Sequence, residues 1–257
     1  EQHRLPVLAA NLVVLAGSDH NPPDRPGLAA FTADMLDEGT RTRSNLQIAE
    51  ELAGLGARLA SGSNTDSSSL SLRTLRHTAD EAFAILADVA QNPAFAPEEI
   101  ERVRASRLTE VVQQRDNPAA VAQRVFNEAL YVQQHPYGYT EVGTAASIQA
   151  ITREEVLSFR QRGYTPANAA LVVAGDITVA DLRELAGKHF GGWQGSAERS
   201  ELPAVEQQAS GRVYVVDAVA KLVKVFSPSG DYLASFGSDH LSSPWGVDVA
   251  SDGTVRV

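Results

Sequence analysis

Apolar residues in the chain follow strand-like spacing in three segments. Residues 6–16 form an apolar run without charged side chains, which predicts a largely buried strand. Residues 67–76 alternate between leucine and polar residues after an Asn-Thr-Asp turn, and with residues 57–62 they predict a half-buried β-hairpin. A third apolar run, at residues 169–174, predicts another buried strand.

Between these segments, apolar residues recur at the three-to-four-residue spacing of amphipathic helices. Ser44, Thr78 and Thr152 each precede a Gln or Glu by three residues, the pattern of a capping box at a helix start. The sequence therefore predicts several helices around a small number of strands. These helices cover residues 27–40, 44–55, 78–91, 97–115, 119–131, 152–164 and 179–190.

The last quarter of the chain has a different character. Residues 193–210 are polar, have no apolar period and predict a linker. Residues 211–257 hold short β-runs separated by Asp, Ser-Gly and Asp-Gly turns. We expect strands at residues 213–216, 222–226, 232–236 and 246–249.

Composition narrows the classes of partner. The chain has a net charge of -10 and a pI near 5.1, which argue against nucleic acid and anionic membranes as partners. No apolar run approaches the roughly 18 residues of a membrane span, so no membrane insertion is expected. The absence of cysteine excludes disulfides and thiolate metal sites. The chain starts at Glu1 beside a strand-like run, so we expect a trimmed start.

The candidate chemistry lies in the predicted helix of residues 27–40. Ala30, Ala33 and Asp34 stand at positions i, i+3 and i+4, so their side chains share one face. A catalytic zinc needs three protein ligands and a water, and the methyl group of Ala30 cannot be a ligand. The methyl group of Ala33 cannot act as a general base. This face therefore predicts packing by small residues rather than catalysis.

The frame around these positions resembles the zinc helix of the M16 (pitrilysin/insulinase) metallopeptidases, G-L-A-H-x-x-E-H-M-x-x-x-G-T. Ala30 and Asp34 occupy the two histidine positions, and Ala33 occupies the glutamate position. The third zinc ligand of that pattern is a glutamate on the long helix before a D-x-P break, and Glu110 takes this place. We expect Glu110 to be an acid on a solvated helix face near Arg107. The residues that match the frame are Gly27, Leu28, Ala29, Met35, Gly39 and Thr40.

Two later blocks, HPYGYTEVGT at residues 135–144 and YTPANAALVVAGD at residues 164–176, resemble further M16 signatures. The resemblance covers residues 3–217 and implies an α+β fold with an antiparallel sheet flanked by helices. We therefore expect an M16-like domain without the zinc motif at residues 1–192, and a linker at residues 193–210. In this interpretation His135 is a turn residue, not a catalyst.

Residues 211–257 resemble one NHL-type propeller repeat, in the segments V-Y-V-x-D, V-F-x-x-x-G, F-G and S-P-W-G-V-x-V. A propeller needs at least about four blades, so a single all-β repeat is expected to be docked or unfolded. The segment GRVYVVD at residues 211–217 also resembles the strand that leads one M16 domain into the next.

The first functional hypothesis is a catalytically inactive M16 domain. The resemblance implies a structural half that encloses an unfolded peptide beside a zinc-bearing M16 domain or subunit. It implies no cofactor in this chain, with zinc only in the active half. It also implies a periplasmic or other cell-envelope location, with the cytoplasm as the other choice.

Two other functional hypotheses stay open, together with the possibility that the C-terminal repeat has no function. The chain could be an active zinc metalloendopeptidase that uses Asp34, Glu110 and a third ligand from elsewhere. It could instead be a protein-binding module that acts through the C-terminal repeat. In the last alternative this repeat has no function. The histidines available for the third ligand are His20, His77, His135, His189 and His240.

Overall fold

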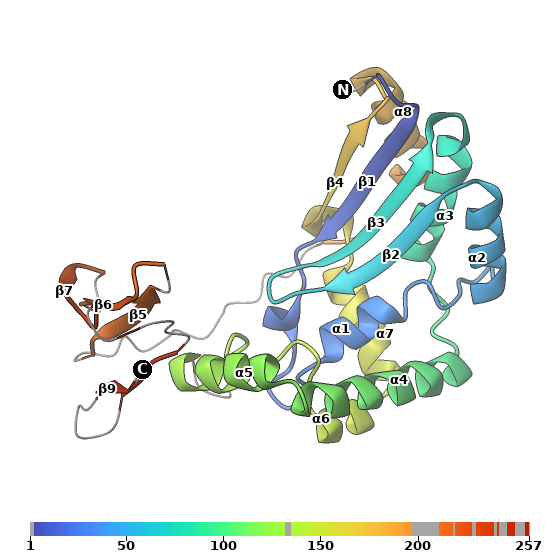
Figure 1. The fold of residues 1–257 in the computed structure, drawn as a ribbon. Coiled ribbons are helices and arrows are strands. Elements are labelled where there is room, and N and C mark those ends of the chain that lie inside the picture. The colour runs from blue at the N-terminus through green and yellow to red at the C-terminus, as the bar shows by residue number, and fades with distance from the viewer. Residues whose placement is uncertain are drawn as a thin grey trace. The chain divides into compact units, whose positions relative to one another are not determined.

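The first strand of the chain becomes an inner strand of a four-stranded antiparallel sheet. In the computed structural model, β1 (Val7–Val14) pairs with β3 (Ser68–Leu75) on one side and β4 (Ala169–Gly175) on the other. β2 (Arg58–Ser63) pairs with β3, which gives the strand order β2-β3-β1-β4 (Figure 1). The predicted α+β class and antiparallel sheet are confirmed.

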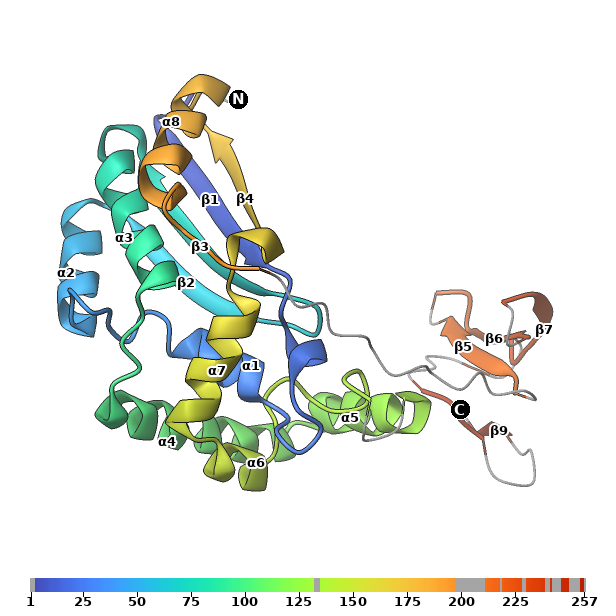
Figure 2. The ribbon, with the colours of Figure 1, turned by 180° about the vertical axis from the view of Figure 1, so that it is seen from behind.

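Helices cover one face of this sheet, as Figure 2 shows for α3, α7 and α8. Side chains of β1 therefore alternate: Leu8, Ala10, Leu12 and Val14 are buried, whereas Val7 is 44% exposed. On β4, Val172 is 59% exposed. The prediction of a largely buried strand therefore holds for every second residue of β1, whereas the buried strand predicted at residues 169–174 was wrong, because in β4 exposed residues alternate with partly buried ones. An unbroken apolar run is typical of a strand covered on both faces, so the sequence alone could not reveal the open one.

The predicted capping boxes have two outcomes. Ser44 and Thr152 accept hydrogen bonds from the backbone N–H groups three residues on, as predicted. Thr78 does not cap α3, because its hydroxyl donates to the carbonyl oxygen of Leu55 instead, over 3.0 Å. The helices are α1 (Leu28–Asp34), α2 (Asn45–Gly54), α3 (Ala79–Gln91), α4 (Pro97–Arg115), α5 (Pro118–Tyr131), α6 (Ala145–Ala150), α7 (Arg153–Gly163) and α8 (Val179–Phe190), with short 3₁₀ turns at Ser18–His20, Arg76–Thr78 and Pro166–Asn168.

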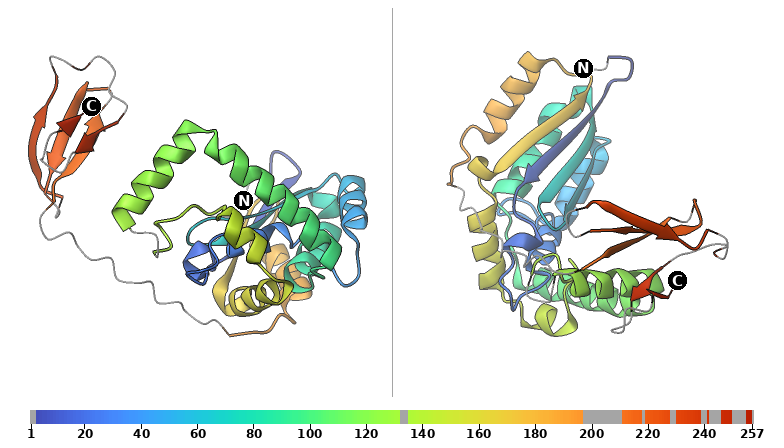
Figure 3. Two further views of the ribbon diagram at one scale, coloured as in Figure 1. Left: turned by 90° about the horizontal axis from the view of Figure 1, so that it is seen from below. Right: turned by 90° about the vertical axis from the view of Figure 1, so that its left-hand side faces the viewer.

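The core lies between the helices and the covered face of the sheet. The apolar stripe of α3, which includes Phe83 and Leu86, is fully buried there together with Phe31 of α1. Below the sheet, α4 runs past α1 and meets α5 at a sharp angle at Asn117-Pro118 (Figure 3). This arrangement brings the face of α1 that carries Ala30, Ala33 and Asp34 next to α4.

The C-terminal residues form a separate small unit. The chain divides into Glu1–Pro203 and Ala204–Val257. In the second unit, β5 (Val213–Asp217), β6 (Leu222–Phe226) and β7 (Tyr232–Phe236) form an antiparallel sheet, and β8 (Asp248–Val249) pairs with β9 (Val255–Arg256). The strands predicted at 213–216, 222–226, 232–236 and 246–249 are therefore present, the last in shorter form.

The structure describes residues 3–131, 135–196, 211–217, 219–227, 230–238, 241, 246–249 and 255–256. Most of the predicted linker at 193–210 lies outside these residues. Within them, no helix combines the length and the apolar character needed to cross a membrane.

Candidate functional site

Helix α1 carries the three positions that the sequence singled out. Gly27 precedes it as the N-cap and has a left-handed backbone with φ of 93°, and the helix residues from Leu28 to Ala33 are buried. Ala30 is 3% exposed and Ala33 is fully buried, which is consistent with the predicted packing of a small-residue face. The side chain of Asp34 is 36% exposed and points to α4.

One guanidinium connects the positions that would hold a metal. Arg107, on α4, donates from Nε to Oδ2 of Asp34 over 2.6 Å and from Nη1 to Oε2 of Glu110 over 3.3 Å. Its Nη2 donates to the carbonyl oxygen of Ala30 over 3.0 Å. The Arg107 side chain is only 10% exposed. A fixed positive charge of the protein therefore lies among the two histidine-equivalent positions and the surviving glutamate.

The donor set does not fit a zinc ion. Ala30 and Ala33 offer no side-chain lone pair, and the carboxylates of Asp34 and Glu110 are both engaged by Arg107. A bound zinc needs three ligands with free lone pairs and would face the positive guanidinium at close range. Across the part of the chain that the structure describes, no three His, Cys, Asp or Glu side chains are placed to share a metal ion.

The histidines considered as a third ligand lie in other environments. His20 Nδ1 is 2.7 Å from Asp19, and His189 Nε2 is 2.9 Å from Asp80. His135 Nδ1 accepts from the backbone N–H of Tyr137, and its own carbonyl oxygen accepts from Gly138, as expected for a turn residue. His77 lies in the 3₁₀ turn before α3, and His240 is outside the described residues. None of the described histidines joins Asp34 and Glu110 in a metal-binding group.

Sequence reasoning placed Glu110 near Arg107 but missed what Arg107 does. The Glu110 side chain is 46% exposed and pairs with Arg107 one helical turn earlier, as expected. The contacts of Arg107 with Asp34 and Ala30 span more than 70 positions, and no local pattern predicts them. Spacing in the sequence indicates only the pair of Arg107 with Glu110, because residues at i and i+3 share a helix face.

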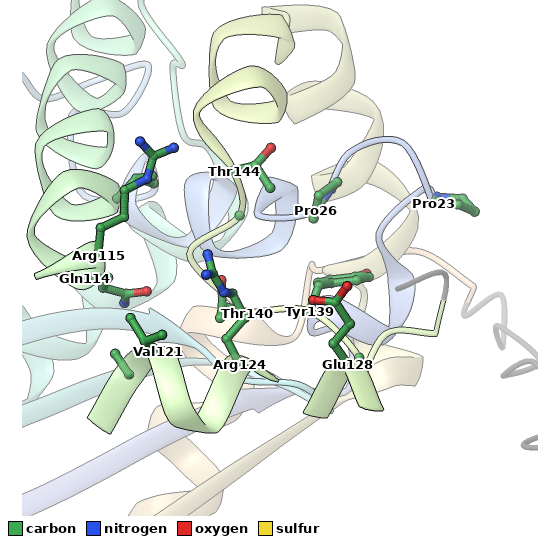
Figure 4. A pocket seen from close by; sticks show the side chains of 14 residues that line it. Pro23, Pro26, Gln114, Arg115, Val121, Arg124, Glu128, Tyr139, Thr140 and Thr144 are labelled. Carbon is green, nitrogen blue, oxygen red and sulfur yellow. The ribbon is translucent and has the colours of Figure 1, made fainter. Parts of the chain in front are cut away.

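A hollow lies beside the C-terminal part of α4, from the residue after Glu110 onward. It has a volume of about 530 Å³ and lies between the end of α4, the start of α5 and the loop at residues 138–144. Val111 and Gln114 line it from α4, and Arg124 and Glu128 project into it from α5 (Figure 4). The hollow is therefore formed by residues of the HPYGYTEVGT block and the long α4 helix together.

An aromatic cluster stands at the other end of this loop. The rings of Tyr131, His135 and Tyr137 contact one another with centroid separations of 5.3 to 5.4 Å. The hydroxyl of Tyr137 donates to Oδ1 of Asp66 over 2.5 Å, which ties the loop to the β2–β3 hairpin.

We expect the pKa of Tyr137 to fall when Asp66 is replaced by Asn. Only the neutral phenol donates to Asp66, and this hydrogen bond raises the pKa of Tyr137 to about 12. Because this value lies above the roughly 10 of an unfolded tyrosine, the stabilising contribution is complete below about pH 10 and is lost as the pH rises toward 12. Phenolate absorbance of the wild type minus that of Tyr137→Phe measures the pKa. Asn keeps an acceptor oxygen but has no negative charge, so an unchanged difference titration in Asp66→Asn would show that the Asp66 carboxylate is not responsible for the raised pKa.

Comparison with known families gives two matches along the chain. The family model described as insulinase, peptidase family M16, matches residues 2–143, and the model described as the peptidase M16 inactive domain matches residues 150–226. The second match runs past residue 211, where the NHL-like repeat was expected to start, and includes β5 and β6. The first two strands of the C-terminal unit are thus similar to M16 sequence.

Individual relatives agree with these matches. An uncharacterized zinc protease of Rickettsia bellii is 31% identical over 71% of this chain and 44% of its own length. Subunit 1 of the bovine mitochondrial cytochrome b-c1 complex is 25% identical over 80% of this chain and 42% of its own length. The crystal structure of a peptidase M16 inactive domain from Pseudomonas fluorescens is 28% identical, with a TM-score of 0.73 over 80% of this chain and 50% of that one. The chain spans about half the length of the relatives it matches.

Proposed function

Because the chain belongs to the M16 peptidase family, we propose that it is a non-catalytic M16 domain that helps to enclose an unfolded peptide beside a zinc-bearing M16 half. The observation that carries this proposal is the guanidinium of Arg107 among Ala30, Asp34 and Glu110. A cation belonging to the protein neutralises the carboxylates there without offering a Lewis acid or an open position for water. The domain keeps the M16 frame but has no group in this place that could activate a water.

The comparisons support a role without catalysis in this half. The inactive domain from Pseudomonas fluorescens is similar over most of the chain, and the related bovine subunit has a name that does not describe a peptidase. Zinc would then be supplied only by the partner half, and the peptide would be its substrate. A cell-envelope location belongs to the same proposal. The competing proposal, an active metalloendopeptidase, needs a third ligand beside Asp34 and Glu110.

We expect the isolated chain to leave an unfolded protein such as reduced casein intact. Adding a zinc-bearing M16 half from the same source should give cleavage that a chelator stops, because the metal enters with the partner. The measurement is peptide release with each chain alone and with both together. Chelator-sensitive cleavage by this chain alone would overturn the proposal in favour of the active peptidase.

A second proposed role, as a binding module, concerns the C-terminal unit. Strand β7 is an edge strand, and all its side chains are exposed, with Tyr232 at 57% and Leu233 at 51%. An exposed apolar edge favours association with another chain. The same assay with a chain that ends at residue 196 tests this role. Unchanged complex formation and cleavage would show that the C-terminal unit does not bind the partner. The assignment of this unit to an NHL-type repeat is part of the same proposal.

A further inference from the structure

A second hollow adjoins the one beside Arg124. It also has a volume of about 530 Å³, and the two share Gln114, Ala120, Tyr139 and Thr140 as lining residues. Helix α5 contributes lining residues to both. One of its sides presents Arg124 and Glu128 to the first hollow, and the next side presents Gln123, Asn127 and Tyr131 to the second. The two hollows therefore form one groove between α5 and the loop at residues 137–144.

The groove is not filled by the side chains of α5. Every α5 side chain that the structure describes is at least partly exposed, including Phe126 at 61% and Val125 at 56%. A helix of this length in a folded domain ordinarily buries an apolar stripe. The side chains of α5 therefore leave the groove open, and its volume can hold a ligand.

The second hollow has an anionic and aromatic lining. Asp66 accepts from Tyr137, and Oε1 of Glu141 accepts from Thr65 over 3.2 Å. Within the described residues, no Lys or Arg pairs with either carboxylate. Tyr131 and Tyr137 stand beside them. Two carboxylates without a basic partner next to aromatic rings favour a Lys or Arg side chain, through charge attraction and cation–π contact.

The first hollow has the opposite preference. Arg115 and Arg124 line it (Figure 4). Neither guanidinium forms an ion pair with an acidic residue that the structure describes. Glu128 projects into the same space, which leaves one net positive charge. Arginine binds carboxylates through two parallel hydrogen bonds where the geometry allows it. A carboxylate of a ligand is therefore favoured at this end.

We propose that this groove binds an extended peptide segment with a Lys or Arg side chain in the tyrosine-lined hollow and an Asp or Glu side chain beside Arg115 and Arg124. The inference rests on the proposed function, since it names the kind of peptide that this half would hold. It also assigns the charges of Asp66, Glu141, Arg115 and Arg124 to recognition, because none of them is used in an ion pair within the described part of the chain.

The test is fluorescence anisotropy with the full chain and labelled Ala/Ser peptides of about ten residues, which span roughly 33 Å when extended. Each peptide carries one Arg and one Glu, in both orders and at several separations. The Asp66→Asn, Glu141→Gln double variant should bind the tightest-binding peptide about tenfold more weakly than the wild type does. The same variant should bind the version with Gln in place of Arg as the wild type does. Both substitutions keep a hydrogen-bond acceptor for Tyr137 and Thr65, so the local fold is preserved.

The matched variant at the other end is Arg115→Gln with Arg124→Gln. Its affinity for the same peptide should fall by a similar factor, whereas its affinity for the version with Gln in place of Glu should equal that of the wild type. Glu50→Gln and Arg58→Gln, exposed charges on α2 and β2, serve as controls and should change nothing. Equal losses for charged and neutral peptides, or no peptide binding by the wild type, would overturn the inference. The proposed function has its own test, because cleavage in the two-half assay could still be restored without this charge preference.

Discussion

Restoring two histidines to α1 is expected to restore zinc binding only when Arg107 is also removed. The variant with Ala30→His, Asp34→His and Arg107→Ala should bind about one zinc ion per chain, with Glu110 as the third ligand. The same two histidines with Arg107 retained should bind zinc at least about a hundredfold more weakly. A unit charge about 4 Å from another costs roughly 4 kcal/mol near a protein surface, and zinc carries two charges. Calorimetric titration with zinc measures both affinities.

Two further variants identify the cause of this difference. Adding Glu110→Gln to the high-affinity variant should remove most of the binding, because a neutral amide is a poor zinc ligand. Arg107→Ala alone should stay without tight zinc binding and should lower the free energy of unfolding by about 2 kcal/mol, the cost of losing hydrogen bonds to charged groups. Equal affinity with and without Arg107 would show that the guanidinium does not block the site.

Replacing Gly143 by Ala should be among the most destabilising single changes in the chain. Its backbone is left-handed, with φ of 86°, and an added Cβ would lie 2.4 Å from the carbonyl oxygen of Pro26 and 3.1 Å from Cα of Gly27. The left-handed backbone costs an alanine roughly 1–2 kcal/mol, and overlap adds roughly 1–3 kcal/mol. We expect a loss of about 3 kcal/mol in urea unfolding followed by circular dichroism.

The control for this change is Gly54→Ala. Gly54 lies in α2, and an added Cβ meets no atom within 4 Å. This substitution should raise the free energy of unfolding by roughly 0.5–1 kcal/mol, since alanine is the better helix former. A small effect of Gly143→Ala, similar in size to this gain, would mean that the loop can move away from α1.

The contact between Gly143 and Gly27 joins two of the sequence blocks that resemble M16 signatures. The start of the α1 block and the end of the HPYGYTEVGT block meet backbone to backbone, so each needs the other's glycine. The starts of α2 and α7 followed from the local capping signals at Ser44 and Thr152. The helix predicted at residues 27–40 was too long, because α1 ends at Asp34. Thr78 shows the limit of this reasoning, because its hydroxyl bonds to Leu55, far away in sequence, instead of capping its own helix.

The candidate site was predictable in part. The sequence showed that Ala30 and Ala33 lack ligand atoms and that Glu110 remains. It could not show that α4 lies close enough for Arg107 to reach α1, because this depends on how α1 and α4 pack. For the same reason the groove beside α5 had no sequence signal: its charged residues come from the β2–β3 turn, the end of α4, α5 itself and the loop at residues 138–144, and only the packing of these segments brings them together.

The most direct test of the central claim is a crystal of the wild-type protein grown with excess zinc and measured at the zinc absorption edge. The account predicts that Arg107 keeps its contacts with Asp34, Glu110 and the carbonyl oxygen of Ala30, and that no anomalous density lies between these residues. A zinc peak bound to Asp34 and Glu110, with Arg107 turned away, would contradict it.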